Sequence, residues 1–524
     1  MTNPRNGGAA VVETLAAHGV DTIFGIPGTH NLEIYRHFPA AGIRAVTPRH
    51  EQGAGYAAEA LARVTGRPGV VVTTSGPGLT NVMTAASTAY AESQPMLVLS
   101  SGLPTGADGR DLGQLHEAKN PLGAMDQLVR WSRRVRTADE AAEAVTEAFE
   151  SFSGGRPRPV HIEIPFDVLE QQWSGRPRVA TKAVAPQADP EAVRRAAEVL
   201  SAARRPMIIA GGGAVDAQAE LTSLAEALGA PVVTTVNGKG VVDEAHPLSA
   251  GASIRLRAAQ KAAADSDALL VVGTELGDSD LWEGQIRGGT VIRCDIDAAQ
   301  LNKNCPADHA LLGDAATTLA ALLAALPGGS GGVERAAPLR AACLREAAKD
   351  AGPYAEINAA VRAALPDDGV LTGDSSQVTY FGSVHFFDVP APRRFCYSPG
   401  FATLGYGLPA GVGAAIGLPG TPVAVLVGDG ALMFSVQELM TLTELRLPVP
   451  VIVVNNGGYQ EIRDQEAARG IPPIGVELRT PDFAALAGAM GARGVRTTST
   501  TELTELVDGA LRADGPTLIH FDIR

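Results

Sequence analysis

The chain has 524 residues, too many for a single hydrophobic core, and this length predicts about three domains. Hydrophobic residues make up 45% and charged residues 19%, so each domain can bury a full core. The formal net charge of −14 argues against a nucleic-acid partner, because the phosphates would be repelled without a basic patch.

The cysteines and the N-terminus indicate a cytoplasmic protein. The four cysteines are too far apart in sequence for a metal knuckle and do not resemble a disulfide framework. The first residues, MTNPRNGGAA, contain no apolar signal core, and no apolar run is long enough to span a bilayer. We therefore expect no membrane partner and a reducing compartment.

Three stretches of the chain alternate short apolar strands with amphipathic helices. Pro/Gly/polar seams separate them near 171–190 and 327–333. This alternation predicts an α/β protein of three doubly wound parallel-sheet domains, at 1–172, 188–328 and 348–524. Ligands of such sheets bind at the carboxyl ends of strands, so the residues that follow each strand are the candidates for function.

In the first stretch, Glu51 follows the strand of IRAVTPRH and opens a helix of small residues. A glutamate at a helix start is common, because the helix dipole favours acids there, so its position alone does not establish a function. In the second stretch, the glycines of PMIIAGGGA (206–214) are only weak evidence for a nucleotide.

The third stretch contains the strongest local signal. The strand VAVLV (423–427) ends in Gly428-Asp429-Gly430, and the strand VIVV (451–454) ends in Asn455-Asn456, with a helix expected between them from Phe434 to Leu445. Neighbouring parallel strands would bring Asp429 and Asn456 together. A carboxylate and an amide carbonyl are hard oxygen ligands suited to Mg²⁺. The glycines allow a sharp turn close to a phosphate, and the following helix start offers free N–H groups.

The segment GDGALMFSVQELMTLTELRLPVPVIVVNNGGY (428–459) resembles the cofactor motif of thiamine-diphosphate enzymes, particularly the acetolactate synthase-like superfamily. The resemblance extends over nearly the whole chain and implies pyrimidine-binding, central and diphosphate-binding domains. It implies Mg²⁺ ligands at Asp429, Asn456 and the main-chain carbonyl of Gly458.

The resemblance also implies catalytic residues. Glu51 matches the glutamate that hydrogen-bonds the aminopyrimidine ring and makes the cofactor reactive. His30 with Gln114, in GRDLGQLHEAKNP, is similar to a pairing in benzaldehyde lyase-like members, so His30 is the candidate to move protons at the substrate. Thr29 stands where some relatives carry an acid; it could donate a hydrogen bond but cannot serve as an acid. A histidine near a loop, such as His116, is more often a structural hydrogen-bonding residue than a substrate contact.

Further segments match the family's site by the same resemblance. FGIPGTHNLEIY (24–35) looks like the first active-site loop, and VVVTTSGPGLTN (70–81) looks like the Gly-rich loop near the thiazolium ring. Leu404 would be the apolar wedge between the two rings, and TGDSSQ (372–377) falls where the family binds the diphosphate. Asp374 departs from that pattern, because a carboxylate is repelled by a diphosphate, and it points instead to a cationic substrate or a backbone amide. The expected cofactor-binding residues are Ser375, Ser376, Gln377, Ala402, Leu404, Gly428, Gly430, Ala431, Met433, Asn456 and Tyr459.

The substrate is expected to be a 2-oxo acid that undergoes non-oxidative decarboxylation. The segments at 233–251 and 455–465 resemble those of 5-guanidino-2-oxopentanoate decarboxylases. Glu461, Asp374 and Glu466 could offer negative charge to a guanidinium group, although acids in loops are usually solvated.

Three alternatives remain at this point. A carboligase or lyase of the acetolactate synthase or benzaldehyde lyase type would share the early chemistry. A non-catalytic regulator would bind the cofactor but would not need Glu51. An oxidase would need FAD, whereas we expect a central domain that binds nothing. The family's shared active sites further imply a homodimer or a dimer of dimers.

Overall fold

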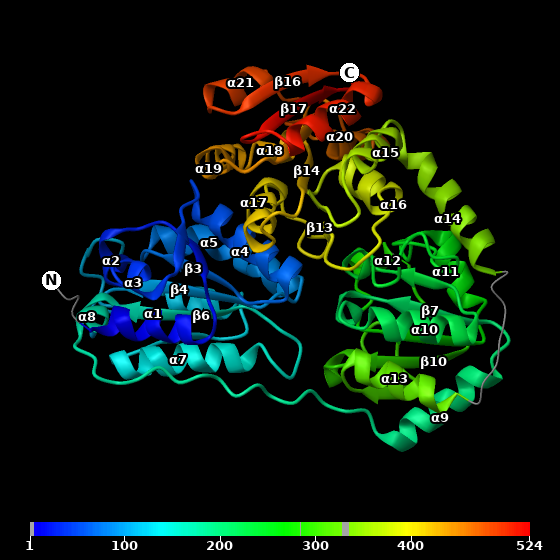
Figure 1. The fold of residues 1–524 in the computed structure, drawn as a ribbon, viewed down its shortest axis with the longest axis horizontal. Coiled ribbons are helices and arrows are strands. Elements are labelled where there is room, and N and C mark those ends of the chain that lie inside the picture. The colour runs from blue at the N-terminus through cyan, green and yellow to red at the C-terminus, as the bar shows by residue number, and fades with distance from the viewer. Residues whose placement is uncertain (1–4, 283, 327–334, 524) are drawn as a thin grey trace. The chain divides into compact units, whose positions relative to one another are not determined.

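The computed structural model of the chain describes residues 5–282, 284–326 and 335–523. Within these residues, three parallel sheets are present, each with helices packed around it (Figure 1). This confirms the predicted class of three doubly wound α/β domains. The seam expected at 327–333, and the domain limits expected at 1, 328 and 524, lie outside the described residues.

The first sheet has the strand order β2-β1-β3-β4-β6-β5. Its strands β3 and β4 are buried along their whole length, as expected for the inner strands of a parallel sheet covered on both faces. Four helices of 11 to 15 residues flank the strands, and α4 begins at Glu51. The strands are β1 Thr22–Gly25, β2 Arg44–Val46, β3 Gly69–Thr73, β4 Met96–Gly102, β5 Ser132–Arg134 and β6 Val160–Pro165; the main helices are α1 Gly7–Ala17, α4 Glu51–Thr65, α5 Pro77–Ala91 and α7 Ala138–Ser151.

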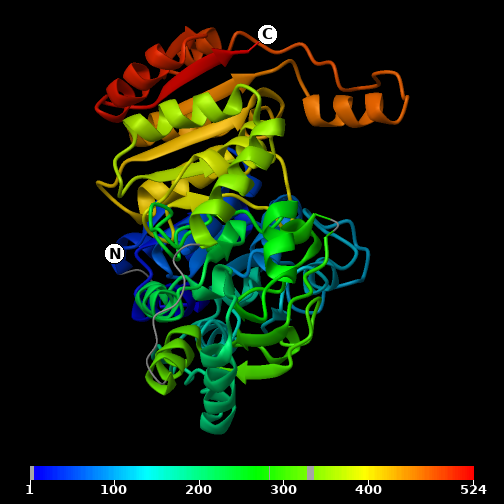
Figure 2. The same ribbon diagram turned by 90° about the vertical axis from the view of Figure 1, so that its right-hand side faces the viewer.

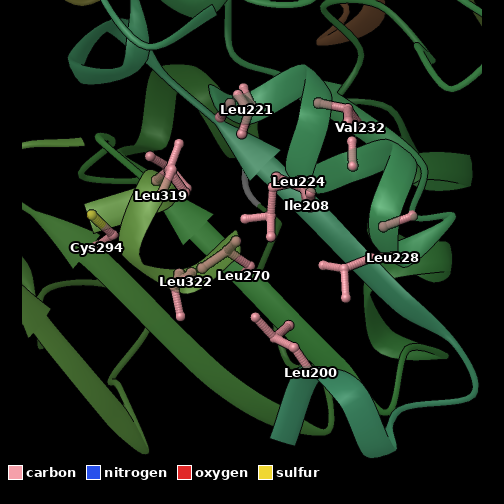
Figure 3. Close-up of a cluster of buried hydrophobic side chains, with 14 of the residues drawn as sticks. Leu200, Ile208, Leu221, Leu224, Leu228, Val232, Leu270, Cys294, Leu319 and Leu322 are labelled. Carbon is pink, nitrogen blue, oxygen red and sulfur yellow. The ribbon is translucent and has the colours of Figure 1, made fainter. Parts of the chain in front are cut away.

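The second sheet has the order β11-β10-β9-β7-β8. One of its faces packs against α9, α10 and α13 through aliphatic side chains such as Leu224, Leu270 and Leu322 (Figure 3). The strands are β7 Pro206–Ala210, β8 Val232–Thr234, β9 Ala268–Val272, β10 Thr290–Asp295 and β11 His309–Leu312; the helices are α9 Pro190–Ala202, α10 Gln218–Leu228, α11 Arg257–Ala264, α12 Asp278–Leu281, α13 Ala315–Ala325 and α14 Ala336–Ala351.

The third sheet has the order β13-β12-β14-β15-β17-β16, the same arrangement as the first apart from numbering. Its central pair, β14 and β15, carries the two halves of the predicted metal motif. The strands are β12 Val370–Gly373, β13 Phe395–Cys396, β14 Val423–Gly428, β15 Pro450–Asn455, β16 Arg493–Thr497 and β17 Thr517–Asp522; the helices include α15 Tyr354–Ala364, α17 Gly407–Gly417, α18 Asp429–Leu432, α19 Leu439–Leu445, α20 Gln460–Ala468, α21 Phe483–Ala489 and α22 Thr500–Leu511.

The described residues form two compact units. The first contains the chain up to Val184 with two later segments, Leu408–Gly420 and Ser435–Leu447. The second contains the remainder, and therefore both the second and the third sheet. Helix α19 and most of α17 thus belong with the first sheet, although the sequence places them within the third stretch.

The helix predicted from Phe434 to Leu445 is wrong in its extent. The chain leaves the helical conformation at Ser435, which has a φ of −146°, and resumes through the 3-10 turn Val436–Glu438. Only α19 is a regular helix in this segment. The interruption turns Glu438 toward the first sheet, where its carboxylate has a specific partner described below.

Helix α20 follows the metal motif and buries none of its residues. In Figure 2, it is the orange helix that projects from the third sheet on an extended connection. None of the described helices is both long and apolar enough to cross a membrane.

Candidate active site

The two halves of the predicted metal motif lie side by side in the third sheet. β14 and β15 are parallel neighbours, and Gly428 is paired with Val454, so Asp429 and Asn456 follow the two strands at the same edge. Asp429 is fully buried, and its Oδ2 accepts hydrogen bonds from the backbone N–H groups of Gly457 at 3.2 Å and Gly458 at 2.9 Å. This arrangement fixes one carboxylate oxygen and leaves Oδ1 for another partner.

The side-chain amide of Asn456 closes on this carboxylate. One terminal atom of the amide lies 3.1 Å from Asp429 Oδ1 and 3.2 Å from the Gly458 carbonyl oxygen, and the other lies 3.2 Å from the Tyr354 hydroxyl. The amide can turn its NH₂ to the two oxygens, or its oxygen if a cation lies among the three. Octahedral Mg²⁺ with ligands at about 2.0–2.1 Å separates adjacent oxygens by about 2.9 Å, close to these spacings.

Burial raises the pKa of the Asp429 carboxyl, although the surrounding backbone N–H groups lower it. A positive charge at this position would favour the ionised carboxylate. No group of three or more His, Cys, Asp or Glu side chains in the described ranges could hold a metal. The candidate ligands here are instead one carboxylate, one amide and one main-chain carbonyl.

Asp374, the unexpected acid in the predicted diphosphate loop, is fully buried and turned inward. Its carboxylate accepts N–H groups from Ser375 at 2.9 Å, Gly405 at 3.1 Å and Gly407 at 2.9 Å. Burial raises its pKa to about 6, and the backbone donors oppose that rise. The backbone-amide alternative is therefore correct, and the role of Asp374 toward a cationic substrate is wrong.

The other residues of this loop differ in what they can donate. Ser375 Oγ is buried with no hydrogen-bond partner in the described part of the chain, which leaves its proton for a ligand. Ser376 Oγ lies 3.3 Å from both the Asp374 carbonyl oxygen and the Gly428 N–H.

Gln377 does not fit the predicted role in binding a diphosphate. Its NH₂ group donates to Glu461 Oε2 and Asp464 Oδ2, both at 3.1 Å, and its Oε1 accepts from the Tyr354 hydroxyl at 2.9 Å. Both ends of the amide are thereby occupied. Gln377 instead connects the Tyr354–Asn456 contact with two carboxylates of α20.

Glu51 opens α4, and its side chain is 8% exposed. The imidazole of His50 caps the helix by accepting the Gln52 N–H at 3.1 Å. Glu51 Oε2 accepts a hydrogen bond from Asn81 Nδ2 at 2.9 Å. A Cβ on Gly78 would lie 3.3 Å from Glu51 Oε1, so the missing side chain at 78 leaves room beside that oxygen.

Glu438 is a buried acid that sequence reasoning missed. Both of its oxygens lie 3.1 Å from the Arg49 N–H, two residues before Glu51, and Oε2 accepts from the Thr441 hydroxyl at 2.7 Å. Burial raises the pKa of Glu438, while these donors lower it. The Glu438 carboxylate thus holds the backbone that leads into Glu51. This contact could not be predicted from the sequence, because Arg49 and Glu438 are 389 residues apart.

The loops that follow β1, β3 and β4 bring two histidines together. His30 Nδ1 lies 2.6 Å from Ser75 Oγ, and His116 Nδ1 lies 3.2 Å from the same oxygen. The rings of His30 and His116 meet edge to face with centroids 5.3 Å apart. Thr29 is exposed at the start of the adjoining 3-10 turn, and Gln114 is half-buried with its N–H donated to Glu117. Ser75 was not predicted from the sequence.

Comparison with known proteins follows the same division into three parts. Models of the thiamine pyrophosphate enzyme match the chain: the N-terminal TPP binding domain at 5–127, the central domain at 193–322 and the C-terminal TPP binding domain at 374–521. The chain belongs to the thiamine pyrophosphate enzyme family.

Named relatives of this thiamine pyrophosphate enzyme include proteins with two kinds of activity in their names. "Probable 2-ketoarginine decarboxylase AruI" of Pseudomonas aeruginosa is 43% identical over 92% of this chain and 88% of that protein. "Probable acetolactate synthase large subunit" of Methanocaldococcus jannaschii is 34% identical over 86% of this chain and 80% of that protein. "Acetolactate synthase isozyme 1 large subunit" of Escherichia coli is 32% identical over 88% and 83%.

The third sheet of this thiamine pyrophosphate enzyme has features that fit a diphosphate with its cation. Three oxygens converge at Asp429, Asn456 and Gly458. The Ser375 hydroxyl, which has no hydrogen-bond partner among the described residues, belongs to a loop that touches the same strand end. A Cβ on Gly428 would lie 3.0 Å from Ser376 Cβ, and one on Gly430 would lie 2.9 Å from the Tyr459 ring. Small residues at 428 and 430 therefore keep the turn narrow, with Ala431 next in α18.

The predicted contacts to the rings of thiamine diphosphate remain predictions. Ala402 adopts a left-handed backbone with a φ of +52°, and its N–H donates to the Ser398 carbonyl, so only its carbonyl oxygen is left for a ligand. Leu404 is half-buried, and Met433 is 46% exposed. These positions are open enough to receive a ligand or another protein surface.

The glycines of the central domain have a packing role. A Cβ on Gly213 would lie 2.7 Å from the Cα of Gly273, and one on Gly211 would lie 2.5 Å from Thr274 Cβ. The loops after β7 and β9 therefore pack directly against each other. This close approach gives the glycines at 211 and 213 a structural role.

Proposed function

We propose that this enzyme decarboxylates 5-guanidino-2-oxopentanoate to 4-guanidinobutanal and CO₂, with thiamine diphosphate and Mg²⁺. The observation that carries the proposal is the 43% identity, over 92% of the chain, to a protein named as a 2-ketoarginine decarboxylase, since 2-ketoarginine is this 2-oxo acid. The paired strand ends of the third sheet, with three oxygens suited to Mg²⁺, support the same conclusion.

In this proposal, Asp429, Asn456 and the Gly458 carbonyl hold Mg²⁺, and Ser375 donates to the diphosphate. Thiamine diphosphate supplies an electron sink for the electron pair left when CO₂ departs. Glu51 presents Oε1 to the aminopyrimidine ring, because Asn81 already occupies Oε2. His30 moves protons at the substrate carbon and oxygen.

The side chain of the substrate is cationic, and α20 offers it a negative surface. Glu461 and Asp464 lie one helical turn apart and share the NH₂ group of Gln377. Gln465 also donates to Glu461 and Gln460 to Asp464, but these uncharged amides do not neutralise the two carboxylates. A guanidinium can donate to both. Glu466, the other acid of this helix predicted for the same role, accepts the Ile474 N–H at 3.3 Å and adds to the negative charge of α20.

The enzyme is proposed to act as a homodimer or a dimer of dimers, with Glu51 of one chain serving the Asp429 region of another. Large apolar side chains of the third sheet and its loops are exposed by 41–67%, although single exposed apolar residues are ordinary. A second copy would cover such a surface. These residues are Phe401, Met433, Phe434, Ile462, Ile471 and Ile474. The free, buried cysteines support a reducing, cytoplasmic setting.

Carboligation is the second candidate, since two of the relatives compared above are named acetolactate synthases. Product analysis separates the two. The enzyme, thiamine diphosphate, Mg²⁺ and 5-guanidino-2-oxopentanoate should give one aldehyde per CO₂ by mass spectrometry. A coupled product formed from pyruvate, with no CO₂ from the guanidino acid, would replace the decarboxylase proposal with the carboligase. A yellow protein with FAD absorbance would indicate that a flavin is also bound.

A further inference from the structure

Ser75 lies between the Nδ1 atoms of His30 and His116, and the proposed function gives it no role. Its side chain is 3% exposed, and its only hydrogen-bond partners in the described part of the chain are His30 at 2.6 Å and His116 at 3.2 Å. The Nε2 atoms of both rings have no hydrogen-bond partner within the same described ranges. Each ring is therefore held at one nitrogen and offers the other.

One hydroxyl group has one proton, and this restricts the two rings together. If Ser75 donates to His116 Nδ1, then His30 must donate its own Nδ1 proton to Ser75, and the reverse arrangement is the other one that satisfies all three groups. The rings then carry opposite tautomers. If both rings donated, the buried Ser75 proton would have no acceptor, which costs about 1–3 kcal/mol.

We propose that Ser75 is a positioning residue that couples the tautomers of His30 and His116, so that one Nε2 always carries a proton while the other is bare. When one Nε2 gives up its proton and the other Nε2 takes one up, a shift of the Nδ1 proton through the Ser75 hydroxyl exchanges the two roles and leaves both rings neutral. The pair is thus a matched acid and base fixed by one serine.

This inference rests on the proposed function, whose chemistry needs such a pair. Conversion of R–CO–COO⁻ and H⁺ to R–CHO and CO₂ breaks one carbon–carbon bond and forms one carbon–hydrogen bond. The oxygen of the 2-oxo group must gain a proton and lose it again before the aldehyde leaves. A protonated Nε2 can supply the proton to the carbon, and a bare Nε2 can remove the one on oxygen.

The fold holds the three residues firmly. His30, Ser75 and His116 follow β1, β3 and β4, which are adjacent in the first sheet, and Glu51 follows β2 at the same edge. The ring of Phe166 stacks on His30, with centroids 5.2 Å apart. Burial, and then the nearby His116, lower the pKa of His30, which favours the neutral ring that tautomer coupling requires.

The backbone brings His116 to the serine loop. A Cβ on Gly76, which has a φ of +58°, would lie 2.5 Å from the His116 carbonyl oxygen, so only glycine permits this approach. His116 itself has a φ of +66°, an unusual backbone for a residue with a side chain. These two features place His116 against Ser75 rather than in an ordinary loop conformation.

The test is nitrogen NMR of the ring nitrogens in enzyme labelled only at histidine, without cofactor, combined with turnover of the loaded enzyme. In the wild type, we expect His30 and His116 to show opposite tautomers. Ser75→Ala should abolish this relationship and lower kcat for decarboxylation by about 10–100-fold with little change in KM. Ser75→Thr, which keeps the hydroxyl, should restore the opposite tautomers and most of the turnover.

Ser100→Ala is the matched control, because Ser100 Oγ contacts His161 Nε2 at 2.8 Å in the same sheet with similar burial. It should alter only the His161 signals and leave kcat unchanged. Identical tautomers at His30 and His116 in an active wild-type enzyme would overturn the inference alone. Opposite tautomers in an enzyme that decarboxylates no 2-oxo acid would instead overturn the proposed function.

Discussion

Asn456 and Asp429 face each other across the ends of two neighbouring strands, with 3.1 Å between the amide end of Asn456 and Oδ1 of Asp429. The Gly458 carbonyl oxygen lies 3.2 Å from the same amide atom. Without a cation, the contact is best satisfied by the Asn456 NH₂ group, whereas Mg²⁺ requires the amide oxygen. The position can therefore exchange a hydrogen bond for a metal ligand by turning one amide.

Asp429→Asn should remove the charge that attracts Mg²⁺ at nearly constant volume. We expect thiamine diphosphate with Mg²⁺ to bind at least about 100-fold more weakly by calorimetry, because even residues behind metal ligands cost 10–100-fold. Asp482→Asn is the control, since Asp482 only caps α21 through the Ala485 N–H at 3.0 Å. Equal cofactor affinity in Asp429→Asn and the wild type would remove Asp429 from the metal site.

Glu51→Gln should leave cofactor binding nearly intact, because the Gln carbonyl can still accept from Asn81. Turnover should fall by about 10²–10⁴-fold, the usual contribution of a positioned proton-transfer group. The measurement is steady-state CO₂ release beside calorimetric cofactor affinity. Turnover close to that of the wild type would refute the activating role of Glu51.

Features set by strand ends could be predicted from the sequence, but contacts between distant segments could not. The strands that end at Gly428 and Asn455 are short, apolar and followed by the motif, so the pairing of Asp429 with Asn456 followed from the rule for parallel sheets. The role of Asp374 was ambiguous, because two of its backbone donors, Gly405 and Gly407, lie more than 30 residues away in the sequence.

The residues that sequence reasoning missed share a physical cause. Nothing in the local sequence marks Ser75, Asn81 and Glu438 as site residues. Their roles depend on contacts with residues that are distant in the sequence. The prediction of an unbroken helix from Phe434 was wrong for a related reason. Its periodicity is helical, but a 3-10 turn directs Glu438 to the Arg49 N–H.

Glu438→Ala should destabilise the protein, because the Arg49 N–H and the buried Thr441 hydroxyl lose their acceptor. We expect the free energy of unfolding to fall by about 1–3 kcal/mol in chemical denaturation. Glu444→Ala is a matched control, since Glu444 pairs with the Arg49 side chain and is 61% exposed. That change should cost less than about 1 kcal/mol. Equal effects of the two variants would contradict the role given to Glu438.

We expect the buried His161 to make the protein less stable in mild acid. It is fully buried between Ser100 and Ser132, and burial lowers its pKa from 6.5 to about 3. The unfolded chain therefore takes up a proton first, and stability is lost as the pH falls below 6.5. The loss at pH 5 is about 2 kcal/mol. In the His161→Gln variant, the free energy of unfolding should differ less between pH 7 and pH 5 than in the wild type. An undiminished difference would show that His161 does not cause the acid sensitivity.

The central claim is tested most directly by initial rates of CO₂ release from three 2-oxo acids with thiamine diphosphate and Mg²⁺. The acids are 5-guanidino-2-oxopentanoate, the uncharged 2-oxohexanoate and pyruvate. We predict that kcat/KM for the guanidino acid exceeds that for 2-oxohexanoate by at least about tenfold, as expected for a charge-assisted hydrogen bond. Equal values for these two acids, or a preference for pyruvate, would contradict the account.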